Sequence, residues 1–347
     1  MALDKKRRKL FEYVFTLLLI ITINFFLPRL MPGDPFLNFS SNYEEVVTLY
    51  TADQLDYYRA YYGLDKPLLN QYGNYLVDLL QGDLGFSYYY QQEVTTILLQ
   101  RLPWTLFLMI TATLCTVLLA LWLGTYSAWR KGQWQDKWLY GVLVFLGEIP
   151  SFLLGLAFLF LLAVQLDLFP MAGAMTPFVS YQSWAEQVGD LLYHAALPLL
   201  TLIIARLGEY YLLVRNTLLT IIPKDYIRTA RAKALGEATI RYRHGLRNAL
   251  LPLVTRVALQ MGSMIGAVVL VENVFSYPGL GLLMQQAVMV RDYPLLQGIF
   301  LFLAIVVMSA NVLADLVSQY LDPRTRDNAV TVKGESDHQR AVSTSNR

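Results

Sequence analysis

Six long apolar runs dominate the chain and predict membrane-spanning helices. They cover residues 10–27, 104–129, 139–166, 195–214, 250–270 and 295–320. Each is close to the ~20 residues that a helix needs to cross the hydrocarbon core of a bilayer. The first run follows a cluster of basic residues, as in a signal peptide, but it is long enough to span and no small-x-small cleavage site follows it. We therefore expect an all-α polytopic membrane protein with six transmembrane helices.

The positions of the basic residues predict the orientation of these helices. Of the 28 Lys and Arg residues, five precede the first run, three lie between the second and third, eight between the fourth and fifth, and five after the sixth. Cytoplasmic segments of membrane proteins carry such an excess. We therefore expect both termini in the cytoplasm and residues 31–101 as a long extracytoplasmic segment, with helices near 51–62 and 68–80.

Composition supports a membrane protein and excludes several other classes. The 347 residues are 55% hydrophobic and 16% charged, against roughly 25% charged in ordinary soluble domains. No G-x-x-x-x-G-K-[ST] pattern occurs, so the chain cannot be an ATP-binding subunit. The single cysteine, Cys115, and three scattered histidines predict no disulfide and no metal site. We find no catalytic triad, paired catalytic carboxylates or nucleophile, and no pattern for nucleic-acid binding, so we do not expect an enzyme.

A basic stretch at residues 225–254 interrupts the apolar pattern between the fourth and fifth runs. It holds six basic residues against two acidic ones. Apolar residues at helical spacing, interrupted at Gly236, predict two short helices joined by a turn, apolar on one face and cationic on the other. In the cytoplasm such a hairpin would offer a docking surface. The alternative is a basic loop that only sets topology and contacts anionic lipid.

Several motifs resemble the permease subunits of binding-protein-dependent ABC importers, in the dipeptide, oligopeptide and nickel branch. RTARAKALGEATIRYRHGLRNALLPLVT, from Arg228, is similar to the cytoplasmic coupling loop of that family. The family usually has Gly after the Lys of ARAK, where this chain has Ala234, so we expect a displaced or slightly reshaped turn. Other matching segments follow in the family's order: MPGDP at 31–35, YGLDKPL at 62–68, GDLGFSY at 82–88, ENVFSYPGLG at 272–281, RDYP at 291–294 and YLDPR at 320–324.

The resemblance covers residues 10–326 and implies a set of partners. It implies a second homologous permease subunit, two ATP-binding subunits that bind the coupling loop at 225–248, an extracytoplasmic solute-binding protein, and the cytoplasmic membrane of a bacterium or archaeon. The chain would hold no cofactor, because the partner ATPases would bind Mg-ATP. Expected substrates are peptides or related small solutes, including a metal chelate or an antimicrobial peptide. The implied coupling residues are Arg228, Ala230, Arg231, Ala232, Lys233, Ala234, Gly236, His244, Arg247 and Asn248.

Together with the apolar runs, the resemblance divides the chain into four parts. Residues 1–30 form a basic segment and the first helix, and residues 31–101 the extracytoplasmic segment. Residues 102–322 form a five-helix transmembrane core, and residues 323–347 a polar cytoplasmic tail that we expect to be disordered.

Ionisable residues inside the spans need a partner or a water-filled face, because each costs at least ~2.5 kcal/mol in lipid. Arg206 and Glu209 are spaced to pair on one helix face or to contact a partner subunit, and a pathway role is the alternative. Glu148 precedes Pro150, where the family often has a small polar residue. It would recognise a cationic substrate or, as the alternative, reach water at the membrane surface.

Further polar residues lie in the last two spans. We expect Arg256 and Gln260 to face the cytoplasmic vestibule or the partner permease, and Asn311 and Asp315 to form hydrogen bonds between helices. After the fifth span the chain is irregular and then forms a short helix at 282–290. Irregular backbone at membrane depth requires shielding, and we expect an outer gate segment that contains Glu272, Phe275, Pro278, Gly279 and Gly281.

Two functions of other classes remain open from the residues alone. An ATP-independent carrier or channel would need coupling-ion sites and two repeat halves with broken helices, whereas this chain has few intramembrane acids. A membrane sensor or scaffold would use the tyrosine-rich outer segment as a ligand platform.

Overall fold

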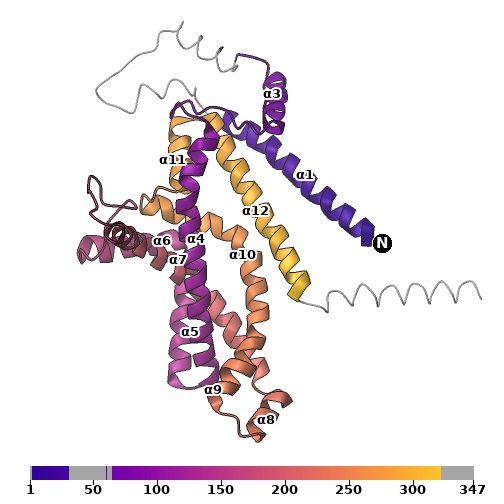
Figure 1. Cartoon of the computed structure of the whole chain (residues 1–347), viewed down its shortest axis with the longest axis vertical. Coiled ribbons are helices and arrows are strands. Elements are labelled where there is room, and N and C mark those ends of the chain that lie inside the picture. Colours follow the sequence, from indigo (N-terminus) through magenta and orange to yellow (C-terminus); the bar gives the residue numbers. More distant parts are fainter. Residues whose placement is uncertain (1, 31–59, 61–64, 322–347) are drawn as a thin grey trace, which may run out of the picture. The chain divides into compact units, whose positions relative to one another are not determined.

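The described part of the chain is helical, as the apolar pattern predicts. The computed structural model describes residues 2–30, 60 and 65–321, in which regular structure is helical apart from one isolated β-bridge between Phe86 and Glu93 (Figure 1). Within these described residues, five helices are long and apolar enough to cross a membrane, and a sixth span results if one bent helix pair counts as a span. The elements are α1 (Ala2–Arg29), α3 (Leu68–Leu80), α4 (Val94–Trp129), α5 (Trp134–Gly147), α6 (Ser151–Phe158), the π-helix η2 (Leu159–Gln165), α7 (Trp184–Ile221), α8 (Asp225–Ala232), α9 (Glu237–Thr239), the π-helix η3 (Ile240–Leu246), α10 (Arg247–Val274), α11 (Leu280–Val290) and α12 (Tyr293–Leu321).

The third apolar run is not the continuous helix that its length predicts. α5 ends at Gly147, and α6 begins only at Ser151. Pro150 carries no N–H for the helical ladder, and its ring disfavours helical geometry at the residue before it. The run is therefore a broken span or a re-entrant loop.

Other helix ends extend beyond the apolar runs. α4 begins at Val94, ten residues before the run that predicts it, and α7 covers Trp184–Ile221. Pro28 lies inside α1 and does not end it. The helix expected at 68–80 is confirmed by α3. The helix expected near 51–62, the MPGDP segment and the tail at 323–347 lie outside the described residues.

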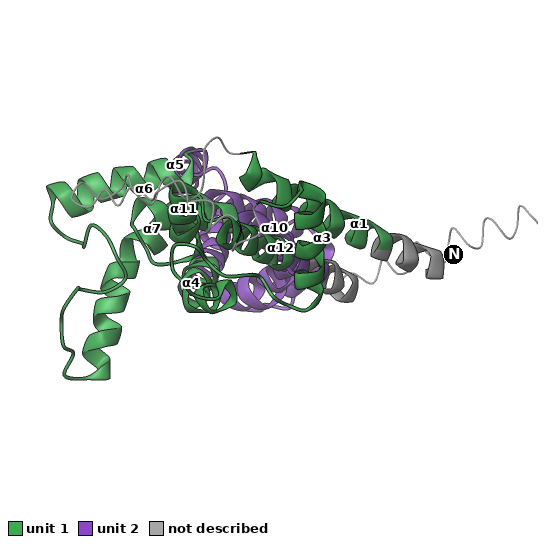
Figure 2. Ribbon diagram, turned by 90° about the horizontal axis from the view of Figure 1, so that it is seen from above, with its two compact units in different colours: residues 1–114, 149–205, 265–306 green, residues 115–148, 206–264, 307–347 purple. Residues whose placement is uncertain are grey.

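The chain divides into two compact units. One contains residues 1–114, 149–205 and 265–306, and the other contains residues 115–148, 206–264 and 307–347 (Figure 2). α4, α7, α10 and α12 each contribute residues to both. We call them the first and the second unit.

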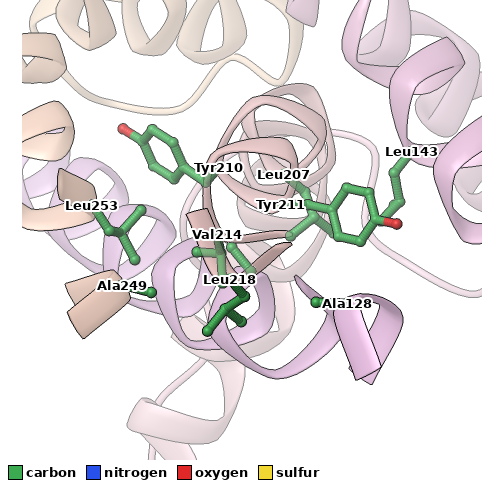
Figure 3. Packing of buried hydrophobic residues seen from close by; sticks show 10 residues of the cluster. Ala128, Leu143, Leu207, Tyr210, Tyr211, Val214, Leu218, Ala249 and Leu253 are labelled. Carbon is green, nitrogen blue, oxygen red and sulfur yellow. The ribbon is translucent and has the colours of Figure 1, made fainter. Parts of the chain in front are cut away.

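Each unit has its own apolar core. In the second unit, Tyr210, Tyr211, Val214 and Leu218 of α7 pack with residues of α4, α5 and α10 (Figure 3). In the first unit, the start of α4 packs with α11 and the start of α12, around Val94 and Leu296. These cores bury one face of helices whose other faces remain apolar and exposed, as expected for helices surrounded by lipid.

Candidate functional site

Residues 225–248, which we call the coupling segment, form a compact hairpin with a buried apolar face. Ile227 and Ala230 of α8 pack against Ile221 and Ile240. Residues 231–239 are all exposed. A small apolar cluster thus holds the hairpin, as the amphipathic pattern predicts, and basic side chains lie on its exposed face.

The turn of this hairpin is at Ala234. Its φ is +53°, in the left-handed region that Gly adopts most readily, whereas Gly236 has a φ of −60°. Ala234 N–H donates to the carbonyl of Arg231, and Leu235 N–H to that of Ala230. The turn is therefore not displaced to Gly236, and Ala234 adopts a backbone conformation that costs an L-residue about 1–2 kcal/mol.

Trp129, the last residue of α4, contacts the second half of the coupling segment. Gly245 lies beneath the indole, where a Cβ atom would come within 2.6 Å of the ring. The Arg241 guanidinium lies 5.4 Å from the ring centroid, and the indole N–H donates to Glu237 at 3.4 Å. Trp at the end of a span is typical of an anchor at the membrane surface. The structure adds that Trp129 fixes the position of the coupling segment on α4.

Polar contacts hold the two ends of the segment together. Asn248 donates to the Tyr226 hydroxyl at 3.1 Å and to the His244 carbonyl at 2.8 Å. Arg231 pairs with Glu237 at 3.2 Å, so one of the expected coupling residues makes an internal contact across the turn. Four further residues of the expected coupling set have exposed side chains. They are Arg228, Ala232, Lys233 and Arg247.

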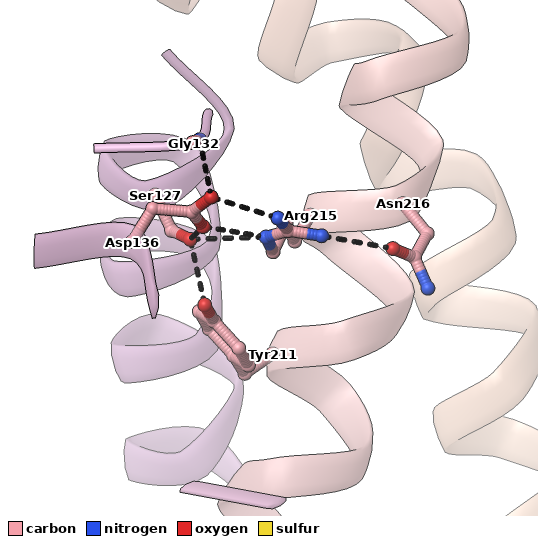
Figure 4. Close-up of polar contacts among 6 residues, drawn as sticks. All are labelled: Ser127, Gly132, Asp136, Tyr211, Arg215 and Asn216. Carbon is pink, nitrogen blue, oxygen red and sulfur yellow. Dashed lines mark hydrogen bonds and ion pairs between the residues drawn. The ribbon is translucent and has the colours of Figure 1, made fainter. Parts of the chain in front are cut away.

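A buried polar network, which the sequence pattern does not predict, joins the turn between α4 and α5 to the last part of α7. Asp136 of α5 is 2% exposed and accepts hydrogen bonds from Arg215 of α7, from the Ser127 hydroxyl and from the Gly132 N–H (Figure 4). Ser127 is also 2.6 Å from the Tyr211 hydroxyl. The network ties the α4–α5 turn to α7 six residues before α7 ends. In the sequence, Asp136 stands out as a single acid among basic and apolar residues, but only the fold shows that Arg215 is its partner.

Four of the expected intramembrane polar residues form one cluster on α7 and α10, which we call the Glu209 cluster. Glu209 Oε1 accepts from Arg256 Nε at 3.0 Å and Nη2 at 2.6 Å, and also from the Gln260 amide. Arg206 Nη1 lies 3.8 Å from Glu209 Oε2. The pairing expected between Arg206 and Glu209 is therefore the longer contact, and Arg256 is the main partner of Glu209.

The residues of the expected outer gate segment also come together. The Glu272 carboxylate accepts from the Gly281 N–H at 2.6 Å, and the Leu280 N–H donates to the Thr105 hydroxyl at 2.8 Å. A Cβ atom on Gly279 would lie 2.1 Å from Glu272 Oε1. Gly is thus required there because the buried carboxylate occupies the space of a side chain. Phe275 is buried, and Pro278 lies in the break between α10 and α11.

A second buried carboxylate joins the GDLGFSY segment to the RDYP corner. Asp292 is fully buried and accepts from the Ser87 hydroxyl at 2.5 Å and from the Tyr89 and Leu295 N–H groups at 3.0 and 3.2 Å. Burial raises the pKa of the Asp292 carboxyl above its ordinary value, and the hydrogen bonds from Ser87 and the backbone act in the opposite direction. Two motifs that are about 200 residues apart in sequence therefore share one contact.

Three expected site residues remain apart from these clusters. Glu148 is exposed at the break between α5 and α6. Asn311 lies on α12 near Gly262 of α10, where a Cβ atom would be 3.6 Å from its Oδ1 atom. The Asp315 side chain is outside the described part of the chain. Among the described residues, no group of three or more His, Cys, Asp or Glu residues could hold a metal ion.

The comparison with protein families is consistent with this arrangement. Residues 120–327 match the family described as binding-protein-dependent transport system inner membrane component, and residues 6–109 match the N-terminal family of the same transport systems. The chain belongs to this family. It is a permease subunit of a binding-protein-dependent ABC importer, a multi-pass membrane protein and a transport component rather than an enzyme.

Curated relatives match the permease over almost its whole length. It is 36% identical to a putative peptide permease protein of Brucella ovis over 313 residues, which are 89% of this chain and 95% of the relative. It is 34% identical to an oligopeptide transport system permease protein of Bacillus subtilis, over 89% of this chain and 94% of the relative. It is 32% identical to a glutathione transport system permease protein of Pectobacterium atrosepticum, over 92% of this chain and 97% of the relative.

Proposed function

We propose that this permease forms half of the translocation pore of a peptide importer and that its coupling segment docks onto a separate ATPase subunit. The relatives named for peptides, oligopeptides and glutathione support peptides as the substrate class. A second homologous permease would complete the pore, and two ATP-binding subunits and an extracytoplasmic binding protein would complete the importer. The membrane would be the cytoplasmic membrane of a bacterium or archaeon.

The observation that carries the docking role is the contrast between the two faces of the coupling segment. Its apolar face is buried against α7 and Trp129, whereas residues 231–239 are exposed and the exposed charged side chains around them are mainly basic. A loop that only set topology would not need a packed core or a fixed contact with α4. The positive-inside distribution of Lys and Arg supports a cytoplasmic position for this segment and for both termini.

The mechanism that follows is mechanical. ATP binding would close the two ATPases and draw the coupling segments of both permeases together. Because the segment continues directly into α10 and is fixed to α4 through Trp129, its displacement would move these helices as rigid bodies. The pore would turn from inward to outward opening and return after hydrolysis. This chain would bind no nucleotide.

Two substitutions separate docking from folding of the segment. A Cβ atom on Gly236 meets nothing within 4 Å, so Gly236→Trp projects into open space and disturbs only an external partner. Ala230 is 5% exposed inside the apolar cluster, so Ala230→Trp disrupts the segment itself. With Gly236→Trp we expect ATP-driven uptake to fall about tenfold or more, equivalent to roughly 1.4 kcal/mol of docking energy. The thermal stability of the chain should not change.

The control is Gly141→Trp, at another glycine of the second unit with nothing within 4 Å of a Cβ atom. Uptake into liposomes and co-purification of the ATPases are measured for the complete complex. Unchanged uptake and ATPase binding in Gly236→Trp would remove the docking assignment. Peptide uptake by the purified permease without any ATPase would instead support an ATP-independent carrier.

A further inference from the structure

The Glu209 cluster carries more positive than negative charge within two membrane-spanning helices. Arg206 and Glu209 lie on α7, and Arg256 and Gln260 lie on α10, all in the second unit. Two guanidinium groups against one carboxylate leave a net charge of about +1, because Arg remains protonated at any physiological pH. A charge in contact with lipid is costly. The cluster must therefore face water, an anion or another protein.

Within the cluster, Arg256 and Arg206 have different roles. Arg256 donates from both Nε and Nη2 to Glu209 Oε1, which the Gln260 amide also contacts. Glu209 is thus largely satisfied from the α10 side. The second cation, Arg206, is consequently not needed to neutralise it.

Arg206 makes only long contacts within the described residues. Its Nη1 lies 3.8 Å from Glu209 Oε2, and its Nη2 lies 3.5 Å from the Ser263 carbonyl oxygen. A guanidinium presents five N–H donors in a planar fork that matches a carboxylate. The Arg206 side chain is 25% exposed, so these donors are accessible.

We propose that Arg206 receives a carboxylate of the transported solute, which for a peptide is its C-terminal carboxylate. This inference rests on the proposed function, because peptide import supplies such a group with every unmodified substrate. Because Glu209 neutralises Arg256, the site keeps a net positive charge of about one, which Arg206 carries. A transport site must bind its solute strongly enough to admit it and weakly enough to release it, and Glu209 moderates the attraction. An acidic side chain of the second permease would offer the same chemistry, and the experiment distinguishes the two sources.

The test compares two forms of one substrate in the complete complex. A tetrapeptide library, as free acids and as C-terminal amides, is offered to liposomes that contain the full importer, and lumenal peptides are quantified by mass spectrometry. The readout is the ratio of free-acid to amide uptake relative to the wild-type complex. The preference of the binding protein cancels in this comparison, because the same binding protein is used throughout.

We expect Arg206→Gln to lower this ratio about tenfold, since a hydrogen bond to a charged group typically contributes on that order. Glu209→Gln should raise the ratio, because it removes the negative charge beside the site. Arg206→Lys, which keeps the charge but not the fork, should give an intermediate ratio and covers the case in which Arg206→Gln fails to assemble. Lys137→Gln removes one exposed positive charge from the same unit and should leave the ratio unchanged.

Three results would overturn the inference. Equal loss of free-acid and amide uptake in Arg206→Gln would indicate a contact with an acid of the partner permease or a structural role. Wild-type uptake of both forms by Arg206→Gln would show that Arg206 does not recognise the carboxylate, and a fall of the ratio in Glu209→Gln would contradict the electrostatic argument. If the wild-type complex takes up neither library, proposed peptide import fails first, and this inference fails with it.

Discussion

The guanidinium of Arg215 binds the carboxylate of Asp136 through two parallel hydrogen bonds. Nε lies 2.8 Å from Oδ1 and Nη2 lies 2.9 Å from Oδ2 (Figure 4). The Asp136 side chain is 3% exposed and that of Arg215 13%. Because Arg215 lies near the end of α7, this pair holds the helix that leads into the coupling segment against the α4–α5 turn. The pair therefore ties α7 to the end of α4, one of the two helices that we propose the coupling segment moves.

Removing one partner of this pair should destabilise the permease strongly. Asp136→Leu leaves the partly buried Arg215 without its carboxylate, and breaking a buried pair in this way costs up to about 3–5 kcal/mol. The double variant Asp136→Leu/Arg215→Met removes both charges and should cost less than the single variant. The measurement is thermal unfolding of the purified chain in detergent. A double variant less stable than Asp136→Leu would contradict this account of the pair.

Ala234 provides a test of backbone strain in the coupling segment. Ala234→Gly relieves the left-handed conformation, and the greater freedom of Gly in the unfolded chain offsets part of the gain, so we expect stabilisation of about 0.5–1 kcal/mol. Ala232→Gly, two residues earlier in regular helix, should destabilise by about 0.5–1 kcal/mol. Hydrogen exchange of amides 225–246 measures both effects. Effects of the same sign at the two positions would argue against the turn at Ala234.

The close approach of α5 and α7 depends on Gly208. A Cβ atom there would lie 2.3 Å from the Leu143 carbonyl oxygen, which is backbone and cannot rotate away. Gly208→Ala should therefore destabilise the chain by about 1–3 kcal/mol. Gly141→Ala meets nothing within 4 Å and should stabilise α5 by up to about 1 kcal/mol. Thermal unfolding of the two variants compares them directly, and equal stability would show that the helices separate at little cost.

The raised pKa of Asp292 predicts the direction of a pH effect on the contact with Ser87 and Tyr89. A carboxyl whose pKa is higher in the folded state stabilises the fold most below its unfolded pKa, and this contribution is lost as pH rises through the folded pKa. Protection of amides 85–91 from hydrogen exchange, corrected for intrinsic rates, should therefore decrease as pH rises from about 4. Asp292→Asn should remove this dependence. Protection that increases over the same range would mean that the hydrogen bonds outweigh burial.

The coupling segment shows which structural features the local sequence pattern can predict. Apolar residues at helical spacing predicted two short helices with a buried face, and Ile227, Ala230 and Ile240 are buried together. The pattern placed the interruption at Gly236 rather than at Ala234, because Ala234 lacks the conformational freedom that marks a turn residue in a sequence. Hydrogen bonds that close the turn, and the packing of Ala230 and Ile240 on either side of it, hold this residue in a conformation that its own propensity disfavours.

The partners of the buried polar residues show what the local sequence pattern cannot predict. Sequence spacing identified Arg206 and Glu209 as a pair on one helix, but Arg256 of another helix is the closer partner of Glu209. Asp136 and Arg215 are 79 residues apart and Ser87 and Asp292 are 205 apart, so no periodicity connects them.

By itself, the sequence determined the helical class, the number of apolar runs, the basic hairpin and the family. These follow from hydrophobicity and short motifs, which act over the few residues of a helical turn or the length of one span. Only the tertiary structure decided the break at Glu148–Pro150, the contacts of Trp129 and the partners of Asp136, Glu209 and Asp292. The reason is physical: a buried charge takes whichever partner the packing of distant helices brings within hydrogen-bond distance.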